Sequence, residues 1–378
     1  MKIVVLGGGR VGRAIVRDLA AEEDYEVLAV DLDPVRLEGM TEFGADGVVA
    51  DLSDAETVSR AVQDADLVVG AVPGFLGYQT VERVLREGRP VVDISMFPED
   101  AFGLEQLAKD AGVPCLFDCG IAPGLSNMIL GHTETELDTT DSYMCFVGGL
   151  PKERTWPWEY KAPFSPADII QEYVQPARMR QNGEDVTMPA LSDIELVHVP
   201  GHGSLEAFNT NGLRSLLRTS KTPNMVEKTL RYPGHAVRIR ILREAGFFSD
   251  KEIQAASGLV IPRDVTEALL FDAWTFAEGE EDMTVMRIVV EGTKDGSRVR
   301  HTWDLIDHYN VTTETMSIAR TTGYTCTAMV RLIAGGLWTE PGLVPPEVVG
   351  ANSDCFSAVR THLKNRGVLV DSKTEELA

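Results

Sequence analysis

Short apolar runs alternate with amphipathic stretches along the first part of the chain. The apolar runs are Ile3–Leu6, Val27–Val30, Val48–Ala50, Leu67–Val69, Val91–Ile94 and Cys115–Phe117. Helical spacing of apolar residues follows at Gly12–Ala20, Ala55–Val62, Tyr78–Glu87 and Leu104–Ala111. Uninterrupted apolar runs are typical of strands buried on both faces, and strand–helix alternation places such strands parallel to one another. The pattern predicts an α/β fold with a doubly wound parallel sheet of the Rossmann type.

The pattern changes after Gly124. Apolar and polar residues alternate singly in Val285–Glu291 and Arg298–Asp304, which predicts antiparallel strands with one solvated face. A long helical pattern of small and apolar residues then covers Ser317–Leu332. We expect this helix to pack against the first domain, and the charged end of the chain, Thr361–Ala378, to fray.

A chain of 378 residues is longer than one hydrophobic core usually supports, so two domains are expected. The first is a Rossmann domain over residues 1–123, completed by residues 317–378. Residues 124–316 form a second, α+β domain with a largely antiparallel sheet, which binds substrate and forms a homodimer.

The chain is strongly acidic, with a formal net charge of −23. Nucleic-acid and anionic-membrane partners are disfavoured because they require clustered Lys and Arg. The acidity fits a solvated, self-repelling surface, and adaptation to high salt is the alternative that composition leaves open. A small-molecule substrate is therefore the expected partner.

Five cysteines stand at wide spacing, which is typical of reduced thiols in a cytosolic protein. Cys115 and Cys119 lie four residues apart without a second pair, and the histidines show no ligand spacing, so we expect no metal site. The apolar run after Lys2 is too short for a signal peptide, and no run has the length of a membrane span. A cytoplasmic location is expected.

A glycine motif marks the first strand–helix junction. Gly7, Gly9 and Gly12 fit the dinucleotide fingerprint G-x-G-x-x-G, directly after a predicted strand and at the start of a predicted helix. In that context the glycines permit a tight turn, close approach of a pyrophosphate, and close helix–strand packing. Asp31 stands 19 residues after Gly12, where a carboxylate binds the ribose hydroxyls and repels a 2′-phosphate. NAD is therefore expected in preference to NADP, although Arg36 follows nearby.

Other cofactor contacts are expected where the remaining strands end. These residues are Arg10, Val11, Leu32, Asp51, Leu52, Val72, Pro73, Ser95, Met96 and Pro123. Each can equally be a turn residue of a strand end.

Several further motifs carry a family resemblance over nearly the whole chain. They are Asp118–Gly124, Val147–Pro151, Glu172–Tyr173, Pro176–Arg178, Glu206–Phe208, Gly212–Ser215, Thr229–His235 and Pro345–Glu347. In these residues the chain resembles the saccharopine dehydrogenase superfamily, and within it most closely the NAD-dependent L-lysine 6-dehydrogenases. The histidine after Gly234 favours the lysine enzymes over the saccharopine reductases.

The resemblance implies oxidative deamination of the lysine ε-carbon. The products would be 2-aminoadipate 6-semialdehyde, which cyclises to piperideine-6-carboxylate, together with ammonia and NADH. A saccharopine-type dehydrogenase or reductase, a dehydrogenase of another amino acid, and a non-catalytic NAD-binding regulator are the alternatives. The sequence leaves open the pocket length, the identity of the base and the direction of the reaction in the cell.

This chemistry requires a base and a carboxylate-binding cation. The ε-amine must be neutral when hydride leaves its carbon, yet its pKa is roughly 10.4. Candidates for the base are Asp118 at the end of the sixth predicted strand, Glu206 in an apolar context, and His235 in a Pro-Gly turn. Candidates for substrate binding are Arg214 and Arg231, which suit a carboxylate, with Tyr160 and Lys161 along the pocket. For each residue a structural role, such as a loop cap or an ion pair, is the alternative.

Overall fold

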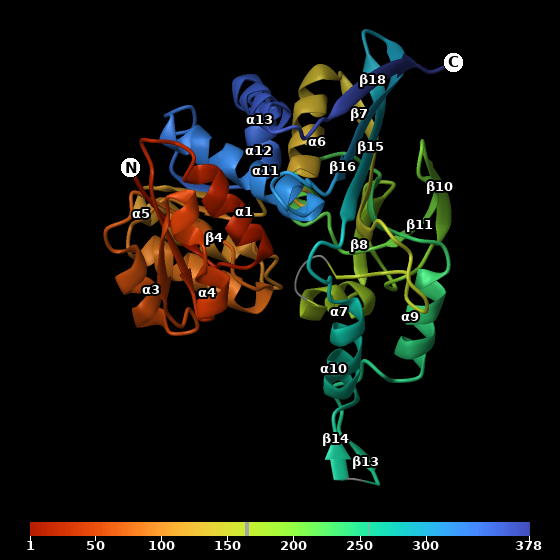
Figure 1. Ribbon diagram of the computed structural model, residues 1–378. Helices are drawn as coiled ribbons and strands as arrows, with labels where there is room; N and C mark the ends of the chain where they lie inside the picture. The colour runs from red at the N-terminus through yellow and green to blue at the C-terminus, as the bar shows by residue number, and fades with distance from the viewer. Residues whose placement is uncertain (163–165, 257) are drawn as a thin grey trace. The chain divides into compact units, whose positions relative to one another are not determined.

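The computed structural model describes residues 1–162, 166–256 and 258–378 (Figure 1). The described chain divides into two compact units. Unit 1 comprises residues 1–136 and 318–369, and unit 2 comprises residues 137–317 and 370–378.

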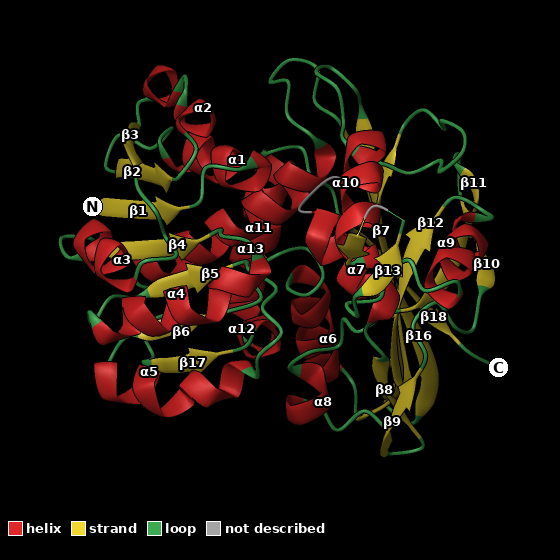
Figure 2. Ribbon diagram, turned by 90° about the horizontal axis from the view of Figure 1, so that it is seen from below, coloured by secondary structure: helices red, strands yellow, loops and turns green. Residues whose placement is uncertain are grey.

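Unit 1 is built on a seven-stranded sheet in the order β17-β6-β5-β4-β1-β2-β3, with every pair parallel (Figure 2). The strands are β1 (Lys2–Leu6), β2 (Glu26–Asp31), β3 (Asp46–Val49), β4 (Leu67–Gly70), β5 (Val91–Asp93), β6 (Pro114–Leu116) and β17 (Gly342–Val344). This is the strand order of a dinucleotide-binding Rossmann sheet with one strand added beside β6. The predicted fold class is confirmed.

Helices cover both faces of this sheet (Figures 1 and 2). They are α1 (Arg10–Leu19), α2 (Pro34–Leu37), α3 (Ala55–Val62), α4 (Gly74–Arg86), α5 (Glu105–Ala111), α6 (Leu125–Glu136), α11 (Ser317–Ala334), α12 (Pro346–Ala351) and α13 (Ser353–Asn365), with 3₁₀ turns at Met40–Phe43 and Ala101–Leu104. On one face, valines and leucines of α3 and α4 pack with β1, β4 and β5 into a continuous core. Burial of both sheet faces explains why β1, β4, β5 and β6 read as uninterrupted apolar runs, whereas the edge strand β3 is exposed.

The C-terminal helices of unit 1 contact its N-terminal part through glycines and charges. A Cβ on Gly131 of α6 would lie 2.0 Å from the carbonyl oxygen of Glu347 in α12, so these two backbones touch. Asp18 of α1 is largely buried, with 9% of its side chain exposed, and pairs with Arg331 of α11 at 2.9 Å and with Arg366 after α13. A buried carboxylate requires such partners, so this network joins α1 to both C-terminal helices.

Unit 2 is built on a nine-stranded sheet in the order β10-β11-β12-β7-β15-β16-β18, with β8 beside β12 and β9 beside β8. The strands are β7 (Thr139–Pro151), β8 (Ala177–Gln181), β9 (Glu184–Met188), β10 (Glu195–Val199), β11 (Gly203–Asn209), β12 (Met225–Arg231), β15 (Asp282–Lys294), β16 (Ser297–His308) and β18 (Asp371–Glu376), with a hairpin of β13 (Ile253–Ala255) and β14 (Gly258–Val260). Neighbouring strands are antiparallel except for β7 and β12. The helices are α7 (Pro166–Val174), α8 (Leu216–Thr219), α9 (His235–Glu244) and α10 (Pro262–Trp274).

The observed units differ from the expected boundaries at two places. Unit 1 extends beyond residue 123 because α6 packs on α12. The end of the chain, which we expected to fray and to complete the first domain, forms β18 and pairs with β16 in unit 2. Backbone hydrogen bonds at a sheet edge hold this charged strand, and a hydrophobic pattern does not report them.

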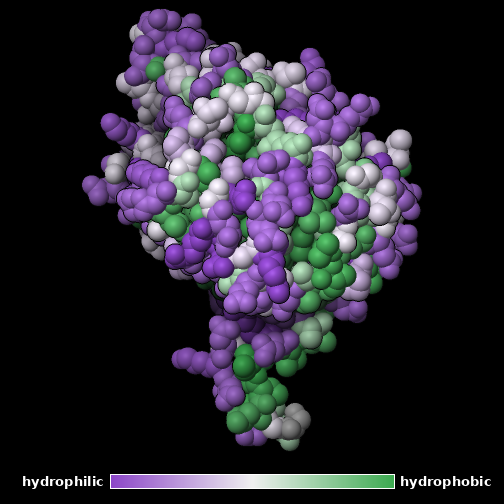
Figure 3. Space-filling view, turned by 90° about the vertical axis from the view of Figure 1, so that its left-hand side faces the viewer, coloured by the Kyte–Doolittle hydropathy of each residue, from purple (hydrophilic) through white to green (hydrophobic). Residues whose placement is uncertain are grey.

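The surface is mostly hydrophilic, as expected for a chain with many charged residues (Figure 3). Hydrophilic residues predominate on the face drawn in Figure 3, and apolar atoms gather on the projection at its bottom, where Figure 1 places β13 and β14. Ile253 and Leu259 of this hairpin are exposed. Across the part of the chain that the structure describes, no helix has the length and apolar character needed to cross a bilayer.

Candidate functional site

The glycine turn after β1 has different spatial requirements at each of its three motif positions. Gly7 has φ +112°, and a Cβ there would lie 2.3 Å from the carbonyl oxygen of Ala71. A Cβ on Gly12 would lie 2.0 Å from the carbonyl oxygen of Gly7. At Gly9 a Cβ would meet nothing within 4 Å. Gly7 and Gly12 are thus required by the packing of the backbone, whereas Gly9 leaves open space in front of α1, where a pyrophosphate would approach.

Asp31 at the end of β2 is held in place by the backbone. Its side chain is buried and accepts hydrogen bonds from the amides of Gly8 at 2.7 Å and Asp33 at 2.9 Å. The exposed guanidinium of Arg36 lies 3.6 Å from the same carboxylate. A carboxylate fixed beside the glycine turn suits ribose hydroxyls, and Arg36 is the nearby group that would suit a phosphate.

The other residues expected at the cofactor fall into exposed and enclosed positions. Arg10, Leu32, Asp51 and Met96 are exposed, while Val11, Pro73 and Pro123 are partly buried and Val72 is buried. Leu52 packs into the core under α3, so its side chain is not displayed at the surface. The Ser95 hydroxyl lies 2.8 Å and 2.7 Å from the two carboxylate oxygens of Asp93. The expectation that the Leu52 side chain contacts the cofactor therefore does not fit its burial.

The loop after β6 is closed on itself. Asp118 is buried and has a positive φ of 54°. A Cβ on Gly124 would lie 1.9 Å from the carbonyl oxygen of Gly120, and α6 begins directly after it at Leu125. This geometry places Asp118 at the carboxyl end of β6, the edge at which open α/β sheets bind ligands.

Glu206 in β11 of unit 2 anchors the start of a helix. One of its carboxylate oxygens accepts from the amide of Gly234 at 2.9 Å, and the other accepts from the amide of Ala236 at 2.5 Å. These amides belong to the first turn of α9, where a carboxylate satisfies free donors and complements the helix dipole. Both oxygens are thus committed to the backbone, a structural role that competes with the base role considered for this residue.

His235 at the start of α9 is completely buried and fully hydrogen-bonded. Its Nδ1 donates to the carbonyl oxygen of Trp158 at 3.2 Å, so its Nε2 accepts from the Tyr173 hydroxyl at 2.9 Å. Burial, followed by the charge of Arg231, lowers the pKa of His235 to about 3. A proton shuttle requires a pKa near the working pH, so the neutral His235 is better suited to joining α9, α7 and the Trp158 segment than to moving protons.

Arg231 at the end of β12 is also enclosed. Its guanidinium lies 3.0 Å from a carboxylate oxygen of Glu172, donates to the carbonyl oxygen of Leu230 at 2.9 Å, and lies 4.5 Å from the ring centroid of Tyr160. The side chain of Arg231 is 3 % exposed. A substrate carboxylate would have to displace Glu172 to reach it, which disfavours the clamp role considered for Arg231.

Arg214, the other candidate clamp, lies in the turn between β11 and α8. It is partly buried and has a positive φ of 48°. A direct role of Arg214 toward substrate stays a prediction.

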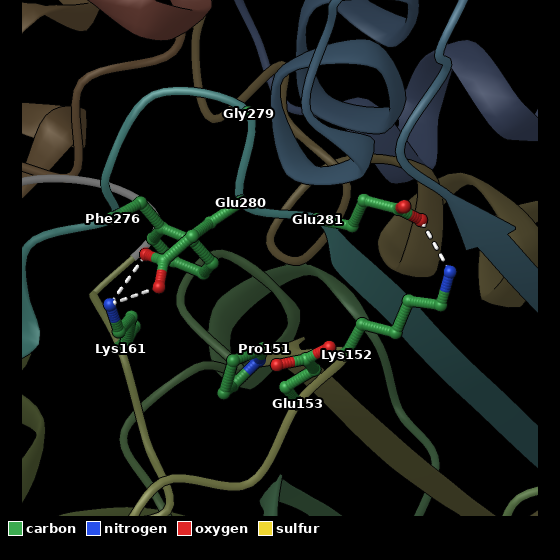
Figure 4. Close-up of a pocket in the computed structure, with 8 residues that line it drawn as sticks. All are labelled: Pro151, Lys152, Glu153, Lys161, Phe276, Gly279, Glu280 and Glu281. Carbon is green, nitrogen blue, oxygen red and sulfur yellow. Dashed lines mark hydrogen bonds and ion pairs between the residues drawn. The ribbon is translucent and has the colours of Figure 1, made fainter.

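Lys161 lines a pocket in unit 2, and its neighbour Tyr160 does not (Figure 4). The pocket is lined by Pro151, Lys152, Glu153, Lys161, Phe276, Gly279, Glu280 and Glu281. Tyr160 points instead into an aromatic cluster, with its ring centroid 5.3 Å from that of Trp274. Apart from Lys161, sequence reasoning missed these residues because the pocket joins two segments more than a hundred residues apart. The available signal was the charged turn that follows the Gly148–Pro151 run.

Within residues 1–162, 166–256 and 258–378, no group of three or more His, Cys, Asp or Glu residues is placed to hold a metal ion. All five cysteines are buried, and none of them forms a disulfide.

The fold and the glycine turn define unit 1 as a pyridine-nucleotide-binding domain, followed by a second unit with a mixed, mostly antiparallel sheet. The chain belongs to the saccharopine dehydrogenase family. Residues 3–116 match the family's domain described as "Saccharopine dehydrogenase NADP binding domain", and residues 120–368 match "Saccharopine dehydrogenase C-terminal domain".

Individual relatives are distant. A saccharopine dehydrogenase [NADP(+), L-glutamate-forming] of Schizosaccharomyces pombe is 21% identical, over 91% of this chain and 93% of its own length. A carboxyaminopropylagmatine dehydrogenase of Synechocystis is 22% identical, over 90% and 91% respectively. An alpha-aminoadipic semialdehyde synthase of Arabidopsis thaliana is 24% identical over 68% of this chain, which spans only 27% of that protein.

The fold is also that of a solved relative. The apo saccharopine dehydrogenase (L-Glu forming) from Saccharomyces cerevisiae superposes with a TM-score of 0.82, over 99% of each chain and with 18% identity. At this identity the likeness concerns the fold alone.

Proposed function

We propose that this protein is an NAD-dependent dehydrogenase that oxidatively deaminates the ε-amine of L-lysine. The products would be ammonia, NADH and 2-aminoadipate 6-semialdehyde, which cyclises to piperideine-6-carboxylate. The observation that carries the proposal is the pocket in unit 2, in which ammonium and carboxylate groups stand side by side as the ends of an amino acid require. Membership of a family that includes amino-acid dehydrogenases supports the reaction type.

The residues of unit 1 fit a dinucleotide. Gly9 leaves space for a pyrophosphate at the start of α1, and Asp31 presents a fixed carboxylate for ribose hydroxyls. When bound, the nicotinamide supplies the hydride acceptor.

The remaining steps need a proton acceptor and a water molecule. The C–H bond of the ε-carbon breaks as hydride leaves, and the nitrogen lone pair forms the C=N bond of a substrate iminium. Water adds to that carbon, and ammonia departs as the aldehyde forms. We assign the proton transfers to Asp118, because the oxygens of Glu206 accept hydrogen bonds from backbone amides and His235 is buried and neutral.

Asp118→Asn is expected to reduce kcat by about 10²–10⁴-fold at nearly unchanged KM, as measured by steady-state kinetics.

Cofactor choice gives a separate prediction. Asp31→Ser is expected to shift the ratio of kcat/KM values for NAD and NADP by about 10–100-fold toward NADP, since a charge-assisted hydrogen bond contributes about 1.5–3 kcal/mol. Paired initial rates with NAD and NADP measure this ratio. Asp64→Ser, an exposed position in the same unit, is the matched control and should leave it unchanged. Equal use of both cofactors by the wild-type protein would contradict our interpretation of Asp31.

A saccharopine-type dehydrogenase is the second candidate, because the S. pombe relative carries that name. Initial rates of NADH formation with L-lysine, L-ornithine and saccharopine, each with NAD and with NADP, separate the candidates. We expect L-lysine with NAD to give the highest kcat/KM. Preference for saccharopine would replace the lysine proposal by the second candidate.

We also propose a homodimer formed through the sheet of unit 2. Met144 and Val289 lie opposite each other in β7 and β15 and are only half-buried within one chain. Apolar side chains on an incompletely covered sheet face favour a partner sheet. Light scattering should give about twice the 41.3 kDa mass of the chain at micromolar concentration, and a monomer would contradict the proposal.

A further inference from the structure

The pocket of unit 2 contains more negative than positive groups (Figure 4). Its carboxylates belong to Glu153, Glu280 and Glu281, and its ammonium groups to Lys152 and Lys161. The Phe276 ring, whose centroid lies 5.9 Å from the Lys161 Nζ, supplies an apolar wall. Such a mixture of opposed charges and an aromatic wall suits a small ligand with a charged head and an alkyl chain.

Two of the carboxylates are already neutralised. The Lys161 Nζ lies 2.6 Å from one oxygen of Glu280, and the Lys152 Nζ lies 2.6 Å from Glu281. In Figure 4, Glu153 lies between these pairs, and no dashed line reaches it from the other residues drawn. The pocket therefore carries one excess negative charge at Glu153.

Lys161 is held in position by its chain neighbours. The carbonyl oxygen of Trp158 accepts from the buried His235, and the amide of Ala162 donates to the carbonyl oxygen of Trp274 at 2.8 Å. Only 15% of the Lys161 side chain is exposed. Because the segment is fixed on both sides of Lys161, its ammonium group is preorganised at the pocket wall rather than free to swing into solvent.

We infer that this pocket selects substrates with one net positive charge, namely diamino monocarboxylic acids, over neutral amino acids and over substrates with additional carboxylates. The inference rests on the proposed function and names its substrate class. The substrate carboxylate takes the place of Glu280 at Lys161, which lines the pocket whereas Arg231 is enclosed, and one substrate ammonium group faces Glu153. An additional carboxylate would meet the excess negative charge of the pocket, which is unfavourable for binding.

Glu153→Gln tests the charge selection. Calorimetric titration of the full chain with L-lysine, L-norleucine and L-2-aminoadipate compares a cationic, a neutral and an anionic side chain of similar length. We expect wild type to bind lysine most tightly and Glu153→Gln to weaken lysine about 2–5-fold with little change for norleucine, as the loss of one solvated ion pair implies. Glu184→Gln, an exposed carboxylate on β9, is the matched control and should bind as wild type does.

The outcomes separate this inference from the proposed function. Wild type that binds all three ligands equally, or fails to bind lysine, overturns the inference, as does a Glu153→Gln variant with unchanged lysine affinity. If that variant forms NADH from lysine at the wild-type KM, the reaction stands and the pocket assignment falls. If lysine binds through Glu153 but yields no NADH, the pocket assignment stands and the proposed reaction falls.

Lys161→Met tests the carboxylate end of the ligand. Cadaverine has the chain and amines of lysine without the carboxylate. Wild type should bind lysine more tightly than cadaverine by about 2–5-fold, and Lys161→Met should remove this difference. A preference for lysine that survives in Lys161→Met would overturn the placement of the carboxylate.

Discussion

Gly9→Val is expected to abolish dinucleotide binding while leaving unit 1 folded. Gly9 has ordinary backbone angles, with φ −63°, and a Cβ there meets nothing within 4 Å. The added side chain would fill the space in which a pyrophosphate must approach the amides of α1. Loss of these charge-assisted hydrogen bonds should cost at least about 3 kcal/mol, or roughly 100-fold or more in Kd. Titration of NADH fluorescence measures binding, and a thermal melt measures folding.

Gly12→Val is the contrasting variant in the same turn. Its Cβ would lie 2.0 Å from the carbonyl oxygen of Gly7, so it should lower the melting temperature as well as binding. A Gly9→Val protein that binds NADH as tightly as wild type would show that the turn is not the phosphate site.

Acidification from pH 6.5 to 4.5 is expected to destabilise the protein strongly. Burial, followed by nearby Arg charge, lowers the pKa values of His235 and His362 to about 3 in the folded state. In the unfolded state their pKa values are about 6.5, so between these values the unfolded chain binds protons that the folded chain excludes. The free energy of unfolding therefore decreases as the pH is lowered, by about 1.4 kcal/mol per pH unit and per histidine. Over this interval the two histidines together cost about 5 kcal/mol.

Asp18 adds to the acid sensitivity at lower pH. Burial alone would raise the pKa of its carboxyl, but Arg331, Thr327 and Arg366 together bring it below the ordinary value. The stabilisation that Asp18 gains from these partners is thus present above the unfolded pKa of Asp and is lost as pH falls through the folded pKa of Asp18.

Denaturant unfolding at several pH values measures this dependence. His235→Gln should reduce the slope of the free energy of unfolding against pH. His308→Gln, at the exposed end of β16, should leave this slope unchanged. A free energy of unfolding that stays constant between pH 6.5 and 4.5 would contradict the burial of neutral histidines.

The Rossmann sheet is predictable from the sequence because its signals are local. Six of its strands lie within two residues of the predicted apolar runs, since burial on both faces requires uninterrupted apolar residues. The glycine turn is predictable because Gly7, Gly9 and Gly12 lie within six residues of one another, although the carbonyl oxygen that Gly7 approaches belongs to the distant Ala71. The strand β17 was missed because its apolar residues, Leu343 and Val344, stand between prolines and far from the strand–helix alternation of residues 1–123.

The roles of the site residues depend on contacts that no local pattern reports. Glu206 reads as a buried carboxylate in an apolar strand, but its partners are amides about thirty residues away in α9. Arg231 reads as a carboxylate clamp, but it meets Glu172 from another helix. Likewise Lys152 and Glu281 become neighbours only because β7 and β15 pair. Pairing between distant segments decides which charges remain available for a ligand.

The nitrogen that leaves the substrate tests the central claim most directly. The protein is incubated with NAD and with L-lysine labelled with ¹⁵N at either the ε or the α position, and the ammonia released is analysed by mass spectrometry alongside NADH. We expect one ¹⁵N-ammonia per NADH from ε-labelled lysine and unlabelled ammonia from α-labelled lysine. Label released from the α position, or no ammonia and no NADH from either substrate, would contradict the proposed deamination of the ε-amine.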